Sequence, residues 1–302
     1  MTNFLLIANT QSGSFDKETL ADAVASFEKA GHSVNVAETF HKGDGAKIMA
    51  DADPEKNPSV IVAGGGGLVS EVIDALMNRD DYDKFTFGII PMGALNVLAL
   101  EMGLTEPNAA IAAICSGKIQ KITLGQAKTP EGTRLFTVLA GAGNDTWTVK
   151  KLRLKLKECS GKWEFFKTFL RVALISSFPA VKAEIDGRPY DGDMICACNG
   201  KYYGGPFRSA ELSDLAEDEF EVVILKKVTL FDLMKHIFSA PMKYLLPEMN
   251  ANVVKAKTLK ITSNEASYPL QIDGDIINTL PAEISVFPKK LALYTRLKID
   301  KK

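Results

Sequence analysis

The 302-residue chain contains little cysteine, little histidine and almost no net charge. Its four cysteines, Cys115, Cys159, Cys196 and Cys198, are too few and too irregularly spaced for a disulfide framework or a zinc site, so we expect reduced thiols. The three histidines lie far apart, without the spacing of metal ligands. A net charge of −1, with no long basic tract, argues against nucleic acid as the main partner.

Long apolar runs are also missing. No run reaches the roughly 20 residues that span a bilayer, and no charged segment precedes an apolar signal region at the N-terminus, so we expect a cytoplasmic protein. A peripheral membrane contact stays open, because lysines and an arginine alternate with leucines over residues 150–157 and an apolar segment with basic residues follows at 163–172. The alternative is an ordinary helix with a buried stripe and a solvated basic face.

Glycine, in contrast, is concentrated at one place. Gly64, Gly65, Gly66 and Gly67 follow the apolar residues 61–63 and precede apolar residues spaced by three and four, which predicts a strand, a glycine turn and a helix. Because glycine has no Cβ, the turn can take positive φ and leave its N–H groups open to an anion, with added positive charge from the helix N-terminus.

Two alternatives limit what this glycine run means. Tight turns and close helix–strand packing also use glycine, so the run alone does not establish a phosphate site. No Walker lysine follows it, which argues against a P-loop NTPase. A second strand, turn and helix pattern at residues 87–104 contains Gly93, Ala94 and Asn96 in its turn.

Four segments together carry a family resemblance. They are I-A-N-T-Q-S-G at residues 7–13, the glycine run with the turn at 93–96, N-G-K-Y-Y-G-G at 199–205 and L-Q-I-D-G-D at 270–275. In this order they resemble the diacylglycerol kinase catalytic family, in its bacterial lipid-kinase-like branch, whose members carry N-P-x-S-G, G-G-D-G-T and G-T-x-N turns. The resemblance spans nearly the whole chain. It places the sequence in the superfamily of diacylglycerol, sphingosine and NAD kinases.

The fold class that we predict is an α/β N-terminal domain with a mostly parallel sheet, followed by a β-rich C-terminal domain that resembles an antiparallel sandwich. Strands at 4–8 and 33–37 flank a helix at 18–30 that Gly31 closes. Beyond residue 125 the strand-like runs are 134–140, 180–185, 194–197, 220–225, 258–262 and 284–288. We expect a nucleotide-binding domain at 1–125, to which 291–302 returns, a lipid-substrate domain at 126–290, and an active site in the cleft between them.

The resemblance also implies site residues. Asp275 is the expected base, with Asp273 beside it, although D-G-D is also an ordinary hairpin turn, because Asp and Gly tolerate positive φ. Leu215, Asp218 and Phe220 resemble a loop that holds a structural Mg²⁺, or else form a solvated acidic turn. The expected nucleotide-binding residues are Asn9, Thr10, Ser12, Gly13, Thr39, Gly64, Gly65, Gly66, Gly67, Leu68, Ser70, Glu71, Gly93, Ala94 and Asn96.

The departures from the family pattern affect chemistry. Gly66 stands where the family has aspartate and Leu68 where it has threonine, which removes a carboxylate and a hydroxyl near the expected phosphates. The implied function is γ-phosphoryl transfer from ATP with Mg²⁺ to a lipid hydroxyl of diacylglycerol or sphingoid type. The alternatives are a nucleotide- or lipid-binding pseudokinase with weak or no activity and, third, an NAD kinase. The sequence leaves a homo-oligomer open.

Overall fold

The computed structural model describes residues 2–13, 15–93, 96–143, 146, 179–203, 207–208, 210, 212–226, 251–265 and 267–296. Ala94, Cys159 and the expected membrane-contact segments at 150–157 and 163–172 lie outside them. The chain forms two compact units, Met1–Leu124 with Phe287–Lys302, and Gly125–Val286. Each unit is described by itself below.

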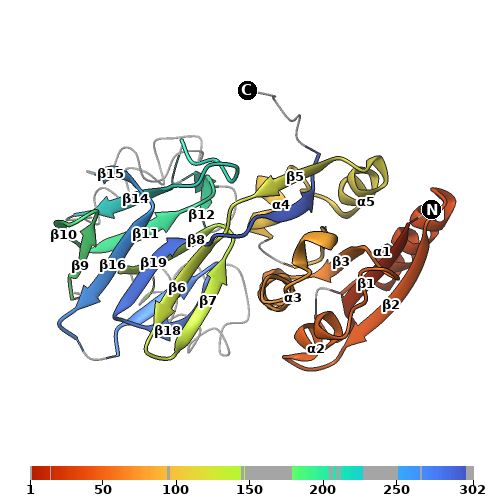
Figure 1. Ribbon diagram of the computed structural model, residues 1–302, viewed down its shortest axis with the longest axis horizontal. Helices are drawn as coiled ribbons and strands as arrows, with labels where there is room; N and C mark the ends of the chain where they lie inside the picture. Colours follow the sequence, from red (N-terminus) through yellow and green to blue (C-terminus); the bar gives the residue numbers. More distant parts are fainter. Residues whose placement is uncertain are drawn as a thin grey trace, which may run out of the picture. The chain divides into compact units, whose positions relative to one another are not determined.

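The first unit alternates strands and helices (Figure 1). Its strands are β1 (Asn3–Asn9), β2 (Ser33–Thr39), β3 (Ser59–Gly64), β4 (Thr86–Pro91), β5 (Ile119–Ile122) and β20 (Leu291–Tyr294). Its helices are α1 (Lys17–Lys29), α2 (Asp44–Ala50), α3 (Gly66–Met77), α4 (Val97–Glu101), α5 (Pro107–Ser116) and the 3-10 helix η1 (Tyr82–Lys84).

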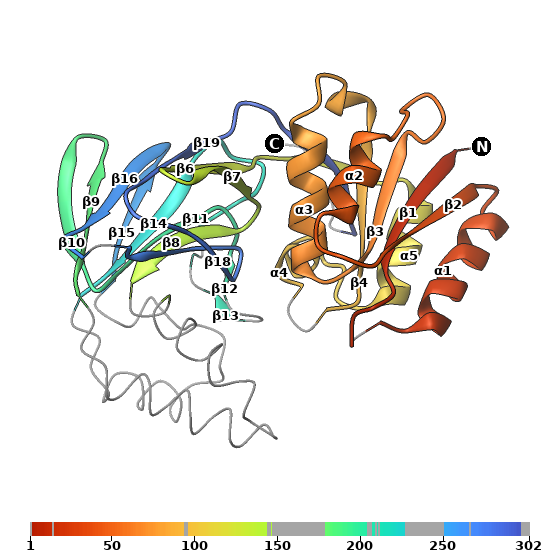
Figure 2. The same ribbon diagram turned by 90° about the horizontal axis from the view of Figure 1, so that it is seen from below.

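These strands form one sheet in the order β2-β1-β3-β4-β20-β5. The pairs β1–β2, β1–β3, β3–β4 and β4–β20 are parallel, whereas β20 and β5 are antiparallel. Helix α1 contacts α5, and α2 contacts α3, and the two pairs cover opposite faces of the sheet (Figure 2). This is a doubly wound α/β arrangement, and it confirms the predicted class of the N-terminal domain.

Local sequence explains where α1 begins and ends. The Asp16 carboxylate accepts hydrogen bonds from the N–H groups of Glu18 and Thr19, which caps the first turn. Phe27 on the buried face packs edge-on against Phe4 of β1, with ring centroids 5.0 Å apart. The chain leaves the helix at Gly31, whose φ is +87°. The predicted helix at 18–30 is confirmed.

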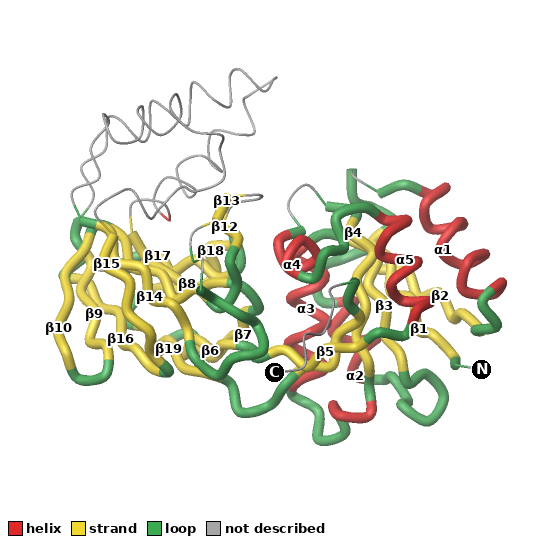
Figure 3. Tube along the Cα trace, turned by 90° about the horizontal axis from the view of Figure 1, so that it is seen from above, coloured by secondary structure: helices red, strands yellow, loops and turns green. Residues whose placement is uncertain are grey.

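The second unit is built from strands in its described part (Figure 3). They are β6 (Gly125–Thr129), β7 (Gly132–Phe136), β8 (Leu139–Gly143), β9 (Val181–Ile185), β10 (Arg188–Gly192), β11 (Met194–Cys198), β12 (Tyr202–Tyr203), β13 (Phe207–Arg208), β14 (Phe220–Leu225), β15 (Ala251–Ala256), β16 (Thr258–Ser263), β17 (Pro269–Ile272), β18 (Asp275–Thr279) and β19 (Ala282–Val286). Two six-stranded antiparallel sheets have the orders β10-β9-β16-β19-β6-β7 and β15-β14-β11-β8-β17-β18.

A single buried cluster lies between these two sheets. It combines Ile185, Ile261 and Ile284 of the first sheet with Ile195 and Ile224 of the second, along with their neighbours. Alternate residues of each strand therefore point into a shared core, as in a β-sandwich. The predicted β-rich, sandwich-like class of the C-terminal domain is confirmed.

One predicted strand was wrong. Residues 134–140 are not continuous, because β7 ends at Phe136 and β8 begins at Leu139, in the other sheet. The N–H groups of Thr137, Val138 and Leu139 all donate to the Asp273 carboxylate instead of to a neighbouring strand. The chain can therefore cross between sheets at this point without losing these hydrogen bonds.

Candidate functional site

The carboxyl ends of the parallel strands define the candidate nucleotide site. In the sheet register Asn9 pairs with Thr39, Ala8 with Ala63 and Gly64 with Pro91, so β1, β2, β3 and β4 end at one edge. The chain runs from β1 outward to β2 and then back past β1 to β3. Between β1 and β3 the strand order reverses, and in open α/β sheets ligands bind beside the strand ends at such a switch point.

The glycine turn lies at this switch point. Gly64 ends β3, Gly65 precedes the helix with φ −90° and ψ 174°, and Gly66 is the first residue of α3. The turn does not use the positive φ that glycine allows, since the described glycines with positive φ all lie elsewhere in the chain. Gly65 has no side chain to cap α3, so no cap side chain accepts from the first-turn N–H groups, and Gly66 and Gly67 are exposed.

Close backbone approach explains one of the glycines in these turns but not another. A Cβ on Gly93 would lie 2.6 Å from the Cα of Gly65, closer than real Cβ contacts allow, so the turns after β3 and β4 touch. A Cβ on Gly67, in contrast, would meet nothing within 4 Å. Packing therefore requires glycine at Gly93 and leaves the glycine at Gly67 without a steric reason.

Asn96 is tied to the same turn. Its Nδ2 donates to the carbonyl of Gly93 over 2.7 Å. Its Oδ1 is buried and has no hydrogen-bond partner in the described part of the chain. A buried acceptor without a donor is costly, so this atom is suited to accept a hydrogen bond from a ligand or a bound water.

Other expected nucleotide-binding residues lie at the same edge of the sheet, and several of them form hydrogen bonds within the protein. Asn9 Oδ1 accepts from the Gln11 N–H over 3.1 Å, and Thr39 Oγ1, which is buried, donates to the Ala8 carbonyl over 3.3 Å. Thr10 Oγ1 donates to Glu38 over 3.1 Å. Ser12 and Gly13 continue the turn that follows β1, and Ser70 is half-buried in α3.

Glu71 and Leu68 of α3 contact the segments that neighbour the glycine turn. The Glu71 carboxylate accepts from the N–H groups of Gly43, over 3.0 Å, and Ala46, over 3.1 Å, which links α3 to the start of α2. A Cβ on Gly45 would lie 2.7 Å from Leu68 Cδ1, and one on Gly64 would lie 3.0 Å from Leu68 Cδ2. Both side chains thus hold neighbouring segments in place, a role that the sequence does not reveal.

The predicted catalytic aspartates belong to the second unit. Asp273 and Gly274 form the two-residue turn between β17 and β18, with φ of +47° and +88°, so the hairpin interpretation is confirmed. The Asp273 carboxylate accepts four hydrogen bonds of 2.7–3.0 Å, from Thr137 Oγ1 and from three successive N–H groups. Burial raises the pKa of this carboxyl, and the hydrogen bonds lower it.

These contacts separate the two aspartates. Three of the four donors are backbone N–H groups, which cannot accept a proton, so Asp273 works as an acceptor that positions residues 137–139. The catalytic role expected for Asp273 stays a prediction. Asp275 opens β18 on the other side of the turn and is half-buried.

The predicted magnesium loop forms a turn before β14. Leu215 and Phe220 are buried, and Asp218 is exposed. No group of three or more His, Cys, Asp or Glu side chains suited to a metal occurs in the described residues. A metal here would depend on carbonyl oxygens with one carboxylate, so this site stays a prediction.

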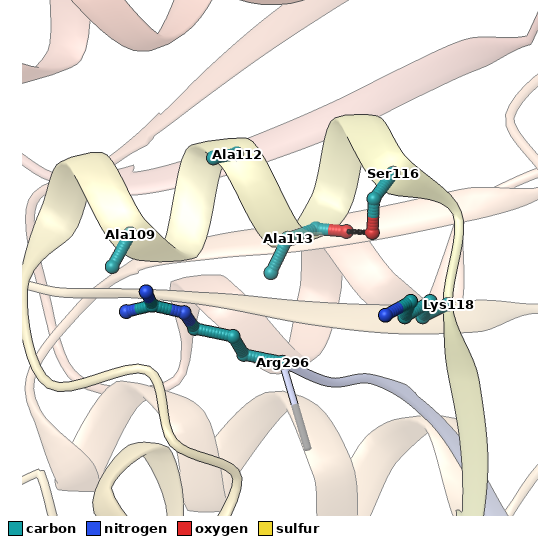
Figure 4. Close-up of a pocket in the computed structure, with 6 residues that line it drawn as sticks. All are labelled: Ala109, Ala112, Ala113, Ser116, Lys118 and Arg296. Atoms are coloured by element: carbon teal, nitrogen blue, oxygen red, sulfur yellow. Dashed lines mark hydrogen bonds between the residues drawn. The ribbon is translucent and has the colours of Figure 1, made fainter. Parts of the chain in front are cut away.

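A separate hollow of about 290 Å³ lies on α5 (Figure 4). It is lined by Ala109, Ala112, Ala113, Ser116, Lys118 and Arg296, none of which was predicted from the sequence to belong to a site.

The described cysteines fit the expected reduced state. Cys196 and Cys198 are buried in β11, and burial raises the pKa of the Cys115 thiol. None of the described helices is long and apolar enough to cross a membrane.

Comparison with known proteins identifies the class. Residues 3–127 match the diacylglycerol kinase catalytic domain, and residues 147–295 match the YegS C-terminal NAD kinase beta sandwich-like domain. The two matches correspond to the α/β unit and the sandwich found in the structure. Residues 3–127 of the chain thus belong to the diacylglycerol kinase catalytic family.

Particular relatives agree with this assignment. The chain is 26% identical to a diacylglycerol kinase of Bacillus subtilis (strain 168) over 285 residues, which cover 92% of this chain and 91% of the relative. It is also 26% identical to a diacylglycerol kinase of Staphylococcus carnosus (strain TM300), over 96% of this chain and 94% of the relative. A crystal structure of a diacylglycerol kinase from Bacillus anthracis str. Sterne has a TM-score of 0.75 at 21% identity and covers 97% of both chains, which shows a shared fold. Together the family and its named members support a lipid-kinase-like function.

Proposed function

We propose that the protein is an ATP-dependent lipid kinase that transfers the γ-phosphoryl group to the hydroxyl of a diacylglycerol or sphingoid lipid. The observation that carries the proposal is the glycine turn at the switch point, where α3 begins without a side-chain cap beside the Gly65–Gly93 contact. Family membership supplies the reaction class. The first unit takes the nucleotide and the second takes the lipid.

The residues divide the work as follows. The N–H groups of Gly65, Gly66 and Gly67 bind the phosphates, and Asn96 Oδ1 accepts a hydrogen bond from a water or hydroxyl beside them. Mg²⁺ accompanies the ATP phosphates and neutralises part of their charge. Asn9, Thr10 and Thr39 belong to the same edge of the sheet.

Asp275 serves as the general base. It removes the proton from the lipid hydroxyl while that oxygen forms a bond to the γ-phosphorus, the bond from phosphorus to the bridging oxygen breaks, and ADP leaves. Asp273 keeps the adjacent turn in place through its four hydrogen bonds. Catalysis depends mainly on positioning the two reactants and on neutralising the phosphate charge, because the protein forms no covalent bond to the transferred phosphoryl group in this direct transfer.

A second candidate function is favoured by two side chains in the glycine turn. Gly66 offers no carboxylate, and Leu68 uses its side chain to pack against Gly45 and Gly64 instead of offering a hydroxyl. Backbone N–H groups still bind phosphates without these groups. The protein would then bind nucleotide or lipid with weak or absent transfer.

The deciding experiment measures transfer of labelled γ-phosphate from ATP with Mg²⁺ to diacylglycerol, sphingosine or NAD⁺. A lipid kinase labels one of the lipids, and Asp275→Asn lowers the rate about 10²–10⁴-fold while the affinity for ATP stays the same. Asp191→Asn, at an exposed position of β10, is the matched control and should not change the rate. Label on NAD⁺ alone would contradict the lipid proposal.

The variant Gly66→Asp separates the two candidate functions. If the natural protein transfers no label but the variant does, the natural protein is the binding protein of the second candidate. If both proteins transfer at similar rates, another group fills the role of the missing carboxylate. If neither protein binds ATP, both the lipid kinase and a nucleotide-binding protein without transfer are contradicted.

A further inference from the structure

Phe40 is an exposed aromatic residue at the edge of the candidate nucleotide site. It follows Thr39, the last residue of β2, and 54% of its surface is exposed. Among the exposed large hydrophobic residues of the described chain it is the only aromatic one. Leaving a phenylalanine in water forgoes the free energy of its burial. A single exposed residue is common, so the case for a use of Phe40 depends on its place beside the candidate site.

The loop that carries Phe40 is held by hydrogen bonds. The Asp44 carboxylate accepts from the N–H groups of Phe40, over 3.1 Å, and His41, over 2.8 Å. These two donors hold the pKa of the Asp44 carboxyl below its ordinary value, so this carboxyl is ionised at neutral pH. Phe40 therefore extends from a defined backbone.

The same loop is fixed to the helix of the glycine turn. Glu71 of α3 binds the N–H groups of Gly43 and Ala46, and Leu68 of α3 contacts Gly45. Phe40 and the phosphate-binding turn thus belong to one rigid group of segments. A ligand that contacts both would bind without reordering the loop.

The separation of the two features suits a nucleotide. Thr39 pairs with Asn9, and Ala8 pairs with Ala63, so the backbones that follow β2 and β3 lie two strand spacings apart, or about 10 Å. An extended nucleoside triphosphate is long enough to reach from a phosphate on the glycine turn to a base at the end of β2. We propose that the base of the bound nucleotide stacks on the Phe40 ring. This inference rests on the proposed nucleotide site and adds the residue that binds the base.

Stacking on a single ring has a recognisable consequence. The ring contacts the π-face that every base has, so Phe40 contributes affinity without reading the edge of the base. Loss of one such contact typically weakens binding by about 5- to 150-fold. Phosphate binding should not depend on it.

The test compares affinities for ATP, GTP and inorganic tripolyphosphate by calorimetric titration of the full chain. Phe40→Ala should weaken the binding of ATP and of GTP by about 5- to 150-fold. The affinity for tripolyphosphate should change by less than about twofold. Phe40→Trp should keep the affinity for ATP, and its added indole fluorescence should change when ATP binds. Val36→Ala removes a similarly exposed side chain, 40% exposed, from β2, the strand that precedes Phe40, and should leave all three affinities unchanged.

Each other outcome is decisive. ATP affinity that Phe40→Ala leaves unchanged would overturn the stacking role and leave the proposed function standing. Equal losses for ATP and tripolyphosphate would show a distorted loop instead of a lost base contact and would also overturn it. A natural protein that binds neither ligand would overturn the proposed nucleotide site and the stacking role together.

Discussion

Gly67→Ala should make the protein more stable and its ATP binding weaker. Gly67 is the second residue of α3, it is exposed, and an added Cβ would meet nothing within 4 Å. Alanine in a helix is more favourable than glycine by about 0.5–1 kcal/mol. For a protein of this size we expect the melting temperature to rise by roughly 1–4 °C.

The expected loss of affinity follows from the phosphates. A methyl group at position 67 would stand beside the N–H groups that we propose bind the phosphates, and a hydrogen bond to a charged group contributes about 1.5–3 kcal/mol. Displacing one such hydrogen bond should weaken the binding of ATP by about tenfold or more. The stability and the affinity therefore change in opposite directions, which is unusual for a purely structural glycine.

Scanning calorimetry without ligand and titration with ATP measure the two effects separately. Gly93→Ala is the contrasting variant, because its Cβ would lie 2.6 Å from Gly65 Cα, and we expect it to lower stability by about 1–3 kcal/mol. A Gly67→Ala protein with raised stability and full ATP affinity would refute a phosphate site at the start of α3. A lower melting temperature would refute the open space on which the reasoning depends.

Two further predictions concern aspartates that hold backbone N–H groups. Asp273→Asn exchanges an acceptor for a donor against the N–H groups of residues 137–139, so urea denaturation should show a loss of about 1–3 kcal/mol, and an unchanged midpoint would contradict the positioning role. Asp44 has a folded-state pKa below its ordinary 3.8, so its stabilisation is present above about pH 3.8 and lost as the pH falls through the folded value. The stability difference between the natural protein and Asp44→Asn should therefore shrink in acid; a difference that stays constant down to pH 3 would contradict this.

The sequence predicts most of the fold, because its signals are local. β14 has the predicted bounds, since six consecutive residues, F-E-V-V-I-L, are bounded by polar turns. The helix α1 is predicted from its spacing and from Gly31. Period and turn residues are properties of neighbouring positions, so a single sequence contains them.

The break between β7 and β8 could not be predicted in this way. It depends on Asp273, which is separated by 136 positions from Thr137. The apolar run at 134–140 reads locally as one strand, and the long-range contact overrides that preference. For the same reason the sequence alone does not show that Asp273 accepts hydrogen bonds from residues 137–139.

The glycine run shows a subtler limit. The order of strand, turn and helix was predicted, but the reason for each glycine was not. Close packing, the simpler alternative, accounts for Gly93 against Gly65, and it does not account for Gly67. Only the positions of neighbouring backbones distinguish a glycine needed for packing from one that leaves room for a ligand.

Gly66 and Leu68, which replace the aspartate and threonine of the family pattern, differ in what can be learned by restoring the family residue. Leu68 packs against Gly45 and Gly64, so Leu68→Thr would remove buried contacts as well as add a hydroxyl, and a loss of activity would have two explanations. Gly66 is exposed at the first position of α3, where a carboxylate is stabilised by the helix N-terminus by about 0.3–1 kcal/mol. Gly66→Asp therefore adds the missing group at an exposed position, where no buried side chain is removed. Its effect on phosphoryl transfer can be attributed to chemistry, which makes it the more informative of the two reversions.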